Sequence, residues 1–366
     1  LTRLSRRRWL GGKCTKQTSP STAPGSTDLL RARRSAMGSF FDVRLPVGLP
    51  GALDLATRAL DLIDLLEDQL TVYRDHSEVS VVNRTAHQAP VAVEVGLFNL
   101  LDQARRIHEM TEGAYDVTAG ALSVAWGFFQ GPRRVPDPET LAEARARTGQ
   151  HLVHLDPVAR TVSFDRPGIL INLGSIGKGH ALDRAAELIH AHWWPTGALL
   201  HGGQSSVLAV GSPPWQFGGR WEVALRNPFH PERPLGTFRL RDRAMGTSGA
   251  TFQQFEANGR LFGHIIDPRT GEPPQVGPAS VSVLAPTAAE ADALSTAFYL
   301  LGPAKTAACL ANRPDVAALF VLEPAGDERP RAIPIHLTDD DFVADRRLKV
   351  LPPFSREVGP GDRPQP

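Results

Sequence analysis

Asp292 and Thr296 are the two residues whose types and spacing most directly suggest a metal site. They are four positions apart on a predicted helix, so their side chains point to the same face. A carboxylate and a hydroxyl are oxygen ligands of the kind that Mg²⁺ or Ca²⁺ takes in proteins. A hydrogen-bonded polar pair near a helix start is the commoner arrangement, and the pair alone leaves both interpretations open.

A glycine-rich segment, Gly174–Gly179, follows the apolar run 168–173 and opens a predicted helix. Backbone N–H groups in such a loop can approach a phosphate, and the positive end of the helix adds to the attraction. The spacing fits neither the dinucleotide-binding fingerprint nor the Walker A motif. The segment is therefore either a phosphate-binding loop or a simple tight turn.

His264 lies where a predicted strand runs into a turn that contains Pro268 and Gly271. Imidazole titrates near neutral pH, so His264 is a candidate general base, with a structural histidine beside a capped turn as the alternative. The polar cluster Glu112–Thr118 either binds a ligand or forms an ordinary loop, and its Gly113 is typical of a helix C-cap. These residues predict a ligand-binding α/β protein, and they name no reaction.

The elements that position these residues follow from hydrophobic periodicity. Apolar residues recur at helical spacing in 52–70, 96–110, 179–191 and 287–301. Thr287 and Glu290 form a capping box at the start of the last of these helices. Strand patterns fall at 39–45, 91–95, 161–164, 168–173, 198–201, 206–210, 221–225, 236–240, 261–266, 280–285 and 317–322. Several of these strands are consecutive, which favours hairpins and a largely antiparallel sheet.

The composition is that of an ordinary globular protein, with 366 residues, 42% of them hydrophobic and 22% charged. The length allows one large domain or two modest ones. No apolar run reaches the roughly 18–20 residues that a spanning helix needs, which excludes a multi-span membrane protein. The two cysteines, Cys14 and Cys309, cannot form a disulfide framework or a cysteine metal site.

Charge is unevenly distributed along the chain. The first 36 residues hold nine Lys or Arg and one acid, which leaves 31 basic and 38 acidic residues, a net charge of −7, in the rest. An acidic body argues against a nucleic-acid-binding protein. The segment Ser5–Leu10 looks like a twin-arginine export motif, but a polar segment follows it in place of an apolar stretch. We expect a basic leader that is disordered or the remnant of an export signal.

Taken in order, these segments resemble the ApbE family, the FAD:protein FMN transferases. The resemblance runs from Ala36 to Gly302 and covers over two thirds of the chain. Its segments are 36–39, 73–80 with Asn83, 113–118 with 126–128, 172–179 with Asp183, 202–203, 247–249, 264–271 and 291–297. Each segment alone is weak evidence, but eight in the family's order are specific, and the run 264–271 is close to diagnostic.

The resemblance implies an enzyme that splits FAD at its pyrophosphate. It transfers FMN to a Thr or Ser hydroxyl of a target redox protein, releases AMP and requires Mg²⁺. The implied Mg²⁺ ligands are Asp292, Thr296 and the main-chain carbonyl of Gly177. The implied FAD contacts are Met37, Tyr73, Ala114, Tyr115, Asp116, Lys178, His264 and Ile265. The implied base that takes the proton of the acceptor hydroxyl is His264 or Asp267.

The fold that the resemblance implies is a two-lobed, T-fold-like α+β architecture. It has a largely antiparallel sheet, flanking helices and the FAD site between the lobes. We expect residues 1–35 to be leader, 36–350 to be the transferase domain and 351–366 to be a Pro-rich tail. Family members often work outside the cytoplasm on membrane redox complexes. With Arg6 and Arg7, this favours the periplasm or the inner membrane, and the cytoplasm is the alternative.

Three features depart from the family pattern. Asn172 stands where Asp is usual, and Gln204 stands where Asn or Asp is frequent. In the glycine loop, Ser175 and Gly177 stand where Gly and Ala are common, which a main-chain carbonyl ligand tolerates. Loss of the carboxylate at 172 could weaken the metal site, which makes a catalytically impaired FAD-binding protein one alternative. An FAD pyrophosphatase that uses water as acceptor is another. Separately, Ser248–Thr251 has the small-residue form of an acceptor site, so Thr251 is a candidate for self-flavinylation, with coincidence as the alternative.

Overall fold

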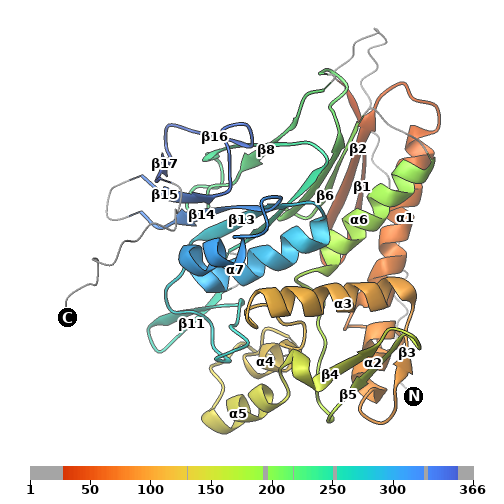
Figure 1. Ribbon diagram of the computed structural model, residues 1–366, viewed down its shortest axis with the longest axis vertical. Helices are drawn as coiled ribbons and strands as arrows, with labels where there is room; N and C mark the ends of the chain where they lie inside the picture. Colours follow the sequence, from red (N-terminus) through yellow and green to blue (C-terminus); the bar gives the residue numbers. More distant parts are fainter. Residues whose placement is uncertain are drawn as a thin grey trace, which may run out of the picture.

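The computed structural model describes residues 28–129, 131–192, 197–216, 218–249, 254–324 and 329–352. The export-like segment Ser5–Leu10 and the residues from 353 onward of the predicted tail lie outside these ranges. Figure 1 shows two lobes, an upper one built on a large sheet and a lower one of short helices and strands.

A nine-stranded sheet forms the centre of the upper lobe, in the order β1-β2-β6-β7-β10-β13-β14-β15-β17. Every neighbouring pair is antiparallel except β15 and β17. The expected, largely antiparallel sheet is therefore confirmed. The strands are Leu29–Ala36, Ser39–Pro46, Gly197–Gly202, Ser206–Gly211, Arg243–Ser248, Ser280–Ala285, Ala317–Leu322, Arg331–Ile335 and Lys349–Val350, in that same order.

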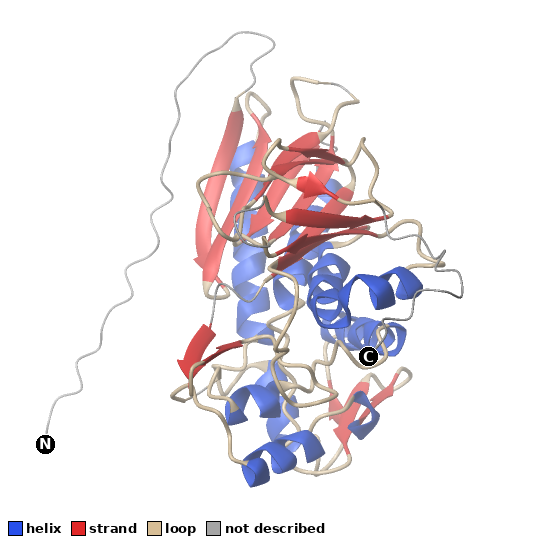
Figure 2. Cartoon of the chain, turned by 90° about the vertical axis from the view of Figure 1, so that its left-hand side faces the viewer, coloured by secondary structure: helices blue, strands red, loops and turns tan. Residues whose placement is uncertain are grey.

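Three long helices cover one face of this sheet (Figures 1 and 2). They are α1 (Ala52–Leu70), α6 (Gly177–His192) and α7 (Ala288–Cys309). α1 contacts β1 and β2, α6 contacts β6 and β7, and α7 contacts β10 and β13. Apolar side chains three and four positions apart, such as Ala56, Leu60 and Ile63, are buried on the sheet side of α1. A non-helical backbone at Gly302 (φ 71°, ψ 173°), followed by Pro303, interrupts α7.

A small second sheet packs against the other face of the large one. Its strands are β16 (Phe342–Ala344), β9 (Gly236–Leu240) and β8 (Trp221–Leu225). Met245 and Leu284 of the large sheet and Phe238 of the small one belong to one buried cluster. Because successive side chains alternate between faces, each central strand has one set of residues toward the helices and another toward the small sheet.

The lower lobe consists of short elements. An aromatic cluster holds in place the hairpin formed by β11 (Gln254–Ala257) and β12 (Arg260–Gly263). The rings of Trp126 and Phe262 lie 5.3 Å apart, and those of Phe255 and Phe262 lie 5.5 Å apart. The elements are α2 (Glu78–Thr85), β3 (Val91–Ala92), α3 (Val95–Met110), α4 (Gly120–Ala125), α5 (Pro138–Ala146), a 3₁₀ turn (Gln150–Leu152), β4 (Val153–Asp156), β5 (Thr161–Phe164), β11 (Gln254–Ala257) and β12 (Arg260–Gly263).

All four helices expected from periodicity are present, and the segment 52–70 coincides with α1. Thr287 caps α7, because its side chain accepts a hydrogen bond from the backbone N–H of Glu290. The strand expected at 168–173 is wrong. This segment forms only a single bridge, between Ala119 and Leu170. Its alternate residues are buried in the core without strand partners, and burial alone produces such an apolar run.

The leader boundary at residue 35 is also wrong, because β1 begins at Leu29 and pairs with β2 along its whole length. Its arginines made the segment look like part of the basic head. Arg31 forms an ion pair with Asp42, and Arg34 lies 2.8 Å from Asp64 of α1. Such charges are typical of an edge strand, where they oppose pairing with another chain.

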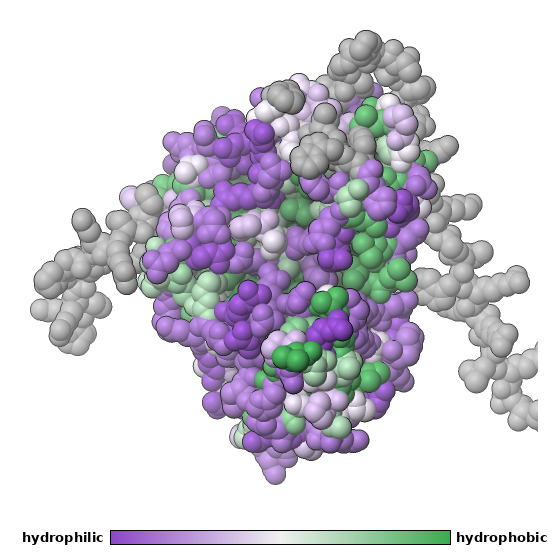
Figure 3. Space-filling model, turned by 45° about the vertical axis from the view of Figure 1, so that its right-hand side comes forward, coloured by the Kyte–Doolittle hydropathy of each residue, from purple (hydrophilic) through white to green (hydrophobic). Residues whose placement is uncertain are grey.

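The face of the molecule seen in Figure 3 is largely hydrophilic, with hydrophobic areas between the hydrophilic residues. Exposed large hydrophobic side chains of this kind are ordinary on a folded protein. Among the helices of the described ranges, none is both long and apolar enough to cross a membrane.

Candidate active site

A cavity of about 620 Å³ lies where α7, the glycine loop before α6 and the lower lobe meet. Its walls come from distant parts of the chain, including the β1–β2 turn, the segment after α3, the ends of β10 and β13, and the turn after β12. This volume is in the range of sites that hold a nucleotide-sized ligand.

The α7 wall of the cavity carries Asp292 and Thr296, whose side chains share a face as their spacing predicted. Asp292 is 6% exposed. Its carboxylate accepts hydrogen bonds from the Ser206 hydroxyl (2.7 and 2.9 Å to the two oxygens) and from the Gly179 N–H (2.9 Å). Thr296 Oγ1 lies 3.1 Å from the Ser248 hydroxyl.

Two glycines allow α7 to approach its neighbours closely. A Cβ atom at Gly179 would lie 2.1 Å from the carbonyl oxygen of Ala288. One at Gly246 on β10 would lie 2.4 Å from the backbone of Ala291. Any side chain at either position would push α7 away, so these glycines fix the depth of Asp292 in the cavity wall.

The oxygen donors around Asp292 fit a hard divalent cation. Burial raises the pKa of Asp292, and Lys178 and the bonds from Ser206 and Gly179 oppose that rise. A carboxylate has about four lone-pair sites, and a single Ser206 hydrogen serves only one oxygen at a time, so the group retains capacity for a ligand. Asp292, Thr296 and the Gly177 carbonyl, at the start of α6, are the residues that would hold Mg²⁺. The described residues contain no group of three or more His, Cys, Asp or Glu side chains suited to a metal.

The glycine loop turns from the buried chain into α6 beside this wall. Asn172 Oδ1 accepts a hydrogen bond from Gly174 N–H at 2.9 Å, which closes the turn. Lys178 Nζ donates to the Gly174 carbonyl at 3.4 Å, and its side chain lines the cavity. An ammonium group above the first turn of a helix provides positive charge for a phosphate.

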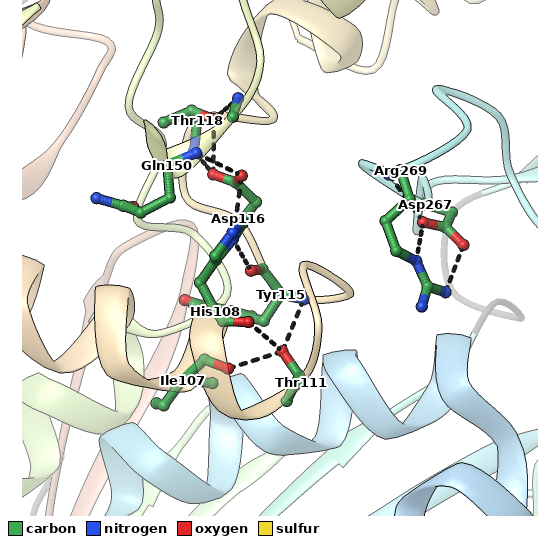
Figure 4. Close-up of polar contacts among 10 residues, drawn as sticks. Ile107, His108, Thr111, Tyr115, Asp116, Thr118, Gln150, Asp267 and Arg269 are labelled. Carbon is green, nitrogen blue, oxygen red and sulfur yellow. Dashed lines mark hydrogen bonds and ion pairs between the residues drawn. The ribbon is translucent and has the colours of Figure 1, made fainter. Parts of the chain in front are cut away.

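The segment after α3 forms a second wall, and Figure 4 shows how it is held. Asp116 accepts hydrogen bonds from Thr118 N–H at 2.8 Å and from Gln150 N–H at 3.1 Å. His108 Nδ1 lies 3.2 Å from the same carboxylate. Tyr115 is buried, and its phenolic oxygen accepts a bond from Ser175 of the glycine loop at 3.3 Å. Ala114, Tyr115 and Asp116, three of the residues that the resemblance implies as FAD contacts, line the cavity.

The two candidate bases differ in position. His264 and the neighbouring Ile265 line the cavity, and the His264 ring lies edge-on to Phe128 with centroids 6.5 Å apart. Asp267 does not line the cavity. The Arg269 guanidinium donates two hydrogen bonds to its carboxylate, of 2.9 and 2.7 Å (Figure 4). The structure therefore brings His264 to the site and leaves Asp267 in the adjoining turn.

Of the remaining predicted FAD contacts, one lines the cavity and one does not. Met37 adopts a left-handed backbone (φ 51°) in the β1–β2 turn and lines the cavity. Tyr73 is 74% exposed and lies outside the cavity lining, with its ring 5.1 Å from that of Phe129. Ser248 lines the cavity, whereas Thr251, the candidate for self-flavinylation, lies outside the described residues.

Sequence reasoning did not single out several hydroxyl groups of the site. Ser206, Ser280 and Ser282 are small polar residues inside apolar strands, and only their alternation with Val and Leu distinguishes them. Gln204 lines the cavity and accepts a hydrogen bond from Arg226, which also lines it. No motif marks that contact, because the two residues lie on different strand connections.

A buried carboxylate, neighbouring hydroxyls and a lysine at a helix start are typical of the class of proteins that binds a phosphate-bearing ligand together with a divalent cation. Comparison with known proteins makes this class specific. Residues 37–320 match the family model described as ApbE family. The chain therefore belongs to the ApbE family.

Its relatives carry a consistent name. The FAD:protein FMN transferase of Treponema pallidum is 33% identical over 309 residues, which is 78% of this chain and 83% of that protein. The FAD:protein FMN transferase of Salmonella typhimurium is 29% identical over 321 residues, 86% of this chain and 89% of that protein. Both names describe the same transfer.

Solved structures show the same fold. The ApbE protein of Thermotoga maritima superimposes with a TM-score of 0.73 at 27% identity, covering 81% of this chain and 94% of that one. The flavin transferase ApbE from Vibrio cholerae gives a TM-score of 0.70 at 26% identity, covering 87% of this chain and 98% of that one. The expected α+β architecture is confirmed.

Proposed function

We propose that this protein is an FAD:protein FMN transferase that moves FMN from FAD to a Thr or Ser hydroxyl of a target protein and releases AMP. The relatives' shared name supports the transfer itself. The observation that carries the proposal is the meeting of Asp292, Thr296, Lys178 and His264 in one cavity of nucleotide size.

The reaction needs one bond to form and one to break. The acceptor oxygen bonds to the phosphorus of the FMN half, and the bridging P–O bond of the pyrophosphate breaks, so AMP leaves with the electron pair. Mg²⁺ held by Asp292, Thr296 and the Gly177 carbonyl would supply charge neutralisation at the phosphates. Lys178 adds a fixed positive charge on the same side.

His264 is the residue that takes the proton of the acceptor hydroxyl in this proposal. It is the candidate base that lines the cavity, and imidazole accepts a proton near neutral pH. Asp267, bound to Arg269, holds the turn that carries His264. We assign it a structural role.

The acceptor in this proposal is a Thr or Ser in a small-residue segment of a redox protein outside the cytoplasm. In this proposal the basic leader directs the transferase to that compartment. Intact-mass measurement tests the transfer. The protein is incubated with FAD, Mg²⁺ and an acceptor domain, and the mass should rise by one FMN minus water. An acceptor with its Thr changed to Ala is the control. A labelled control acceptor, or an unlabelled native one, contradicts the proposal.

A further inference from the structure

Trp126, at the C-terminal end of α4, is a buried residue that the proposed reaction does not use. It is 2% exposed and does not line the cavity. Its indole N–H donates a hydrogen bond of 2.8 Å to the main-chain carbonyl of Gly271. The two residues are 145 positions apart in the chain, so this bond joins α4 to the end of the turn that begins at His264.

The turn from His264 to Gly271 is closed by its own backbone. Asp267 N–H donates to the Glu272 carbonyl at 2.9 Å, and Gly271 N–H donates to the Asp267 carbonyl at 2.7 Å. Gly271 is buried and has a left-handed backbone (φ 82°), a conformation that favours glycine. Because Trp126 binds the carbonyl of this same glycine, it fixes the turn at the point where the chain leaves it.

The Trp126 ring holds the strand that leads into the same turn. Phe262 lies on β12, two residues before His264, and its ring centroid is 5.3 Å from that of Trp126. Ile266, two residues after His264, is buried in the same hydrophobic cluster as these two rings. Trp126 thus reaches the chain before His264 through its ring and the chain after it through its N–H.

The backbone on either side of Trp126 is itself fixed. Its N–H donates to the Leu122 carbonyl at 3.0 Å, and its carbonyl accepts a hydrogen bond from Arg134 N–H at 3.1 Å. Gly127 is left-handed (φ 72°), and a Cβ atom there would lie 2.1 Å from the carbonyl oxygen of Pro132. A group whose own position is locked by packing and hydrogen bonds can hold another group in place.

We propose that Trp126 is a positioning residue that holds His264 beside the acceptor hydroxyl. This inference rests on the proposed function, in which His264 takes the proton of that hydroxyl. His264 lines the cavity, whereas Trp126 and Gly271 do not, so Trp126 acts through the turn. Without the indole N–H, the buried Gly271 carbonyl loses a donor and the turn can shift. Displacement of a catalytic group by about 1 Å can cost on the order of a hundredfold in rate.

Trp126→Phe tests this inference, because it keeps an aromatic ring and removes the indole N–H. We expect kcat for FMN transfer to fall by about ten- to a hundredfold. The Kd for FAD, measured by titration calorimetry, should change by less than about threefold, because the walls carried by α6, α7 and the segment after α3 keep their contacts. A loss of kcat that far exceeds the loss of FAD affinity is the sign of a displaced catalytic group.

Trp221→Phe is the matched control. Trp221 is also 2% exposed, and its indole N–H donates to the main-chain carbonyl of Val210 at 3.3 Å. It belongs to the cluster beneath the small sheet and does not line the cavity. Both Trp→Phe variants should lower the melting temperature, but Trp221→Phe should leave kcat unchanged.

Phe262→Leu loosens the same turn from the strand side. It removes the ring that Trp126 contacts on β12 and leaves the indole hydrogen bond in place. We expect kcat to fall here too, with the Kd for FAD within about threefold of the native value. If Trp126→Phe does not fold, these two measurements on Phe262→Leu decide the question.

An unchanged kcat in folded Trp126→Phe overturns the inference. So does an FAD affinity that falls as far as kcat, which would make Trp126 a support of the FAD-binding wall. An equal loss of kcat in Trp221→Phe would reflect general destabilisation and would also overturn it. Absence of transfer by the native protein refutes the proposed function and this inference with it, whereas native transfer with unaltered Trp126→Phe kinetics refutes this inference alone.

Discussion

Asp183 and Asp292 join α6 and α7 by a reciprocal exchange of hydrogen bonds. Each carboxylate accepts hydrogen bonds from backbone N–H groups near the N-terminus of the helix that carries the other aspartate. Asp183 on α6 accepts from Ala288 N–H at 2.7 Å and from Ala289 N–H at 2.9 Å. Asp292 on α7 accepts from Gly179 N–H at 2.9 Å. Carboxylates at helix N-termini are favourably placed, so this exchange fixes both helices at the cavity wall that carries the proposed Mg²⁺ ligands.

Asp183→Ala should loosen that wall. We expect a loss of about 1–2 kcal/mol in the free energy of unfolding, as for other lost helix caps. The Mg²⁺ concentration that gives half-maximal turnover should also rise, because α7 carries two of the proposed ligands. Asp183→Asn keeps one acceptor oxygen, so its unfolding free energy and its Mg²⁺ requirement should both lie between those of the native protein and Asp183→Ala. Denaturant titrations and Mg²⁺-dependent rates measure both effects, and a normal Mg²⁺ dependence in Asp183→Ala would refute the positioning role.

Asp292→Asn should abolish Mg²⁺-dependent turnover while the protein stays folded. The amide oxygen can still accept the Gly179 hydrogen bond, but the negative charge that a hard cation requires is gone. Glu290→Gln is the control, since Glu290 lies two residues earlier on α7 and pairs with Arg313 at 2.8 Å outside the cavity. Rates with and without Mg²⁺ decide the matter, and full activity of Asp292→Asn would show that the metal assignment is wrong.

Asn172→Asp should leave turnover within about twofold of the native rate. The hydrogen bond that Asn172 makes with Gly174 N–H uses only its side-chain oxygen, which Asp also supplies. Asn172→Ala should lower the rate by about tenfold, because the turn loses its side-chain acceptor and the loop its fixed shape. A large gain in Asn172→Asp would instead indicate that the missing carboxylate limits the native enzyme.

His108 should make stability depend on pH above 6.5. Burial lowers the pKa of His108, but its contacts with Asp116 and the Tyr115 carbonyl outweigh this and raise the pKa above its ordinary value. Its charged form is thus favoured in the folded protein. That stabilisation is fully present below 6.5 and disappears as the pH rises through the raised pKa. Melting temperatures between pH 6 and 9 should fall more in the native protein than in His108→Gln, and parallel curves would exclude this role.

Local patterns were sufficient for the parts of the fold that depend on one segment. The stripe of apolar residues on α1, the Thr287 cap of α7 and the shared face of Asp292 and Thr296 all follow from helical geometry. The sequence pattern places β1 in the leader, because its arginines look like part of the basic head. Their partners, such as Asp42 and Asp64, come near only in the folded chain.

The site contains groups that no local pattern could indicate. The carboxylate exchange joins residues 113 positions apart, from Gly179 to Asp292. The contact between the hydroxyls of Thr247 and Ser282 depends on the pairing of β10 with β13, which places the two residues opposite one another. The sequence makes Asp267 a candidate base because it is a carboxylate three positions after His264. Its partner Arg269 and its position outside the cavity are properties of the folded turn.

The most direct test of the proposed transfer is chromatographic measurement of AMP, free FMN and FMN-bearing acceptor after incubation with FAD and Mg²⁺. The measurement is made with and without an acceptor domain. We predict that AMP appears only with acceptor, in a one-to-one ratio with flavinylated acceptor. AMP and free FMN formed equally well without acceptor would indicate a pyrophosphatase. FAD that stays bound and intact would indicate a binding protein, and either result would contradict the transferase assignment.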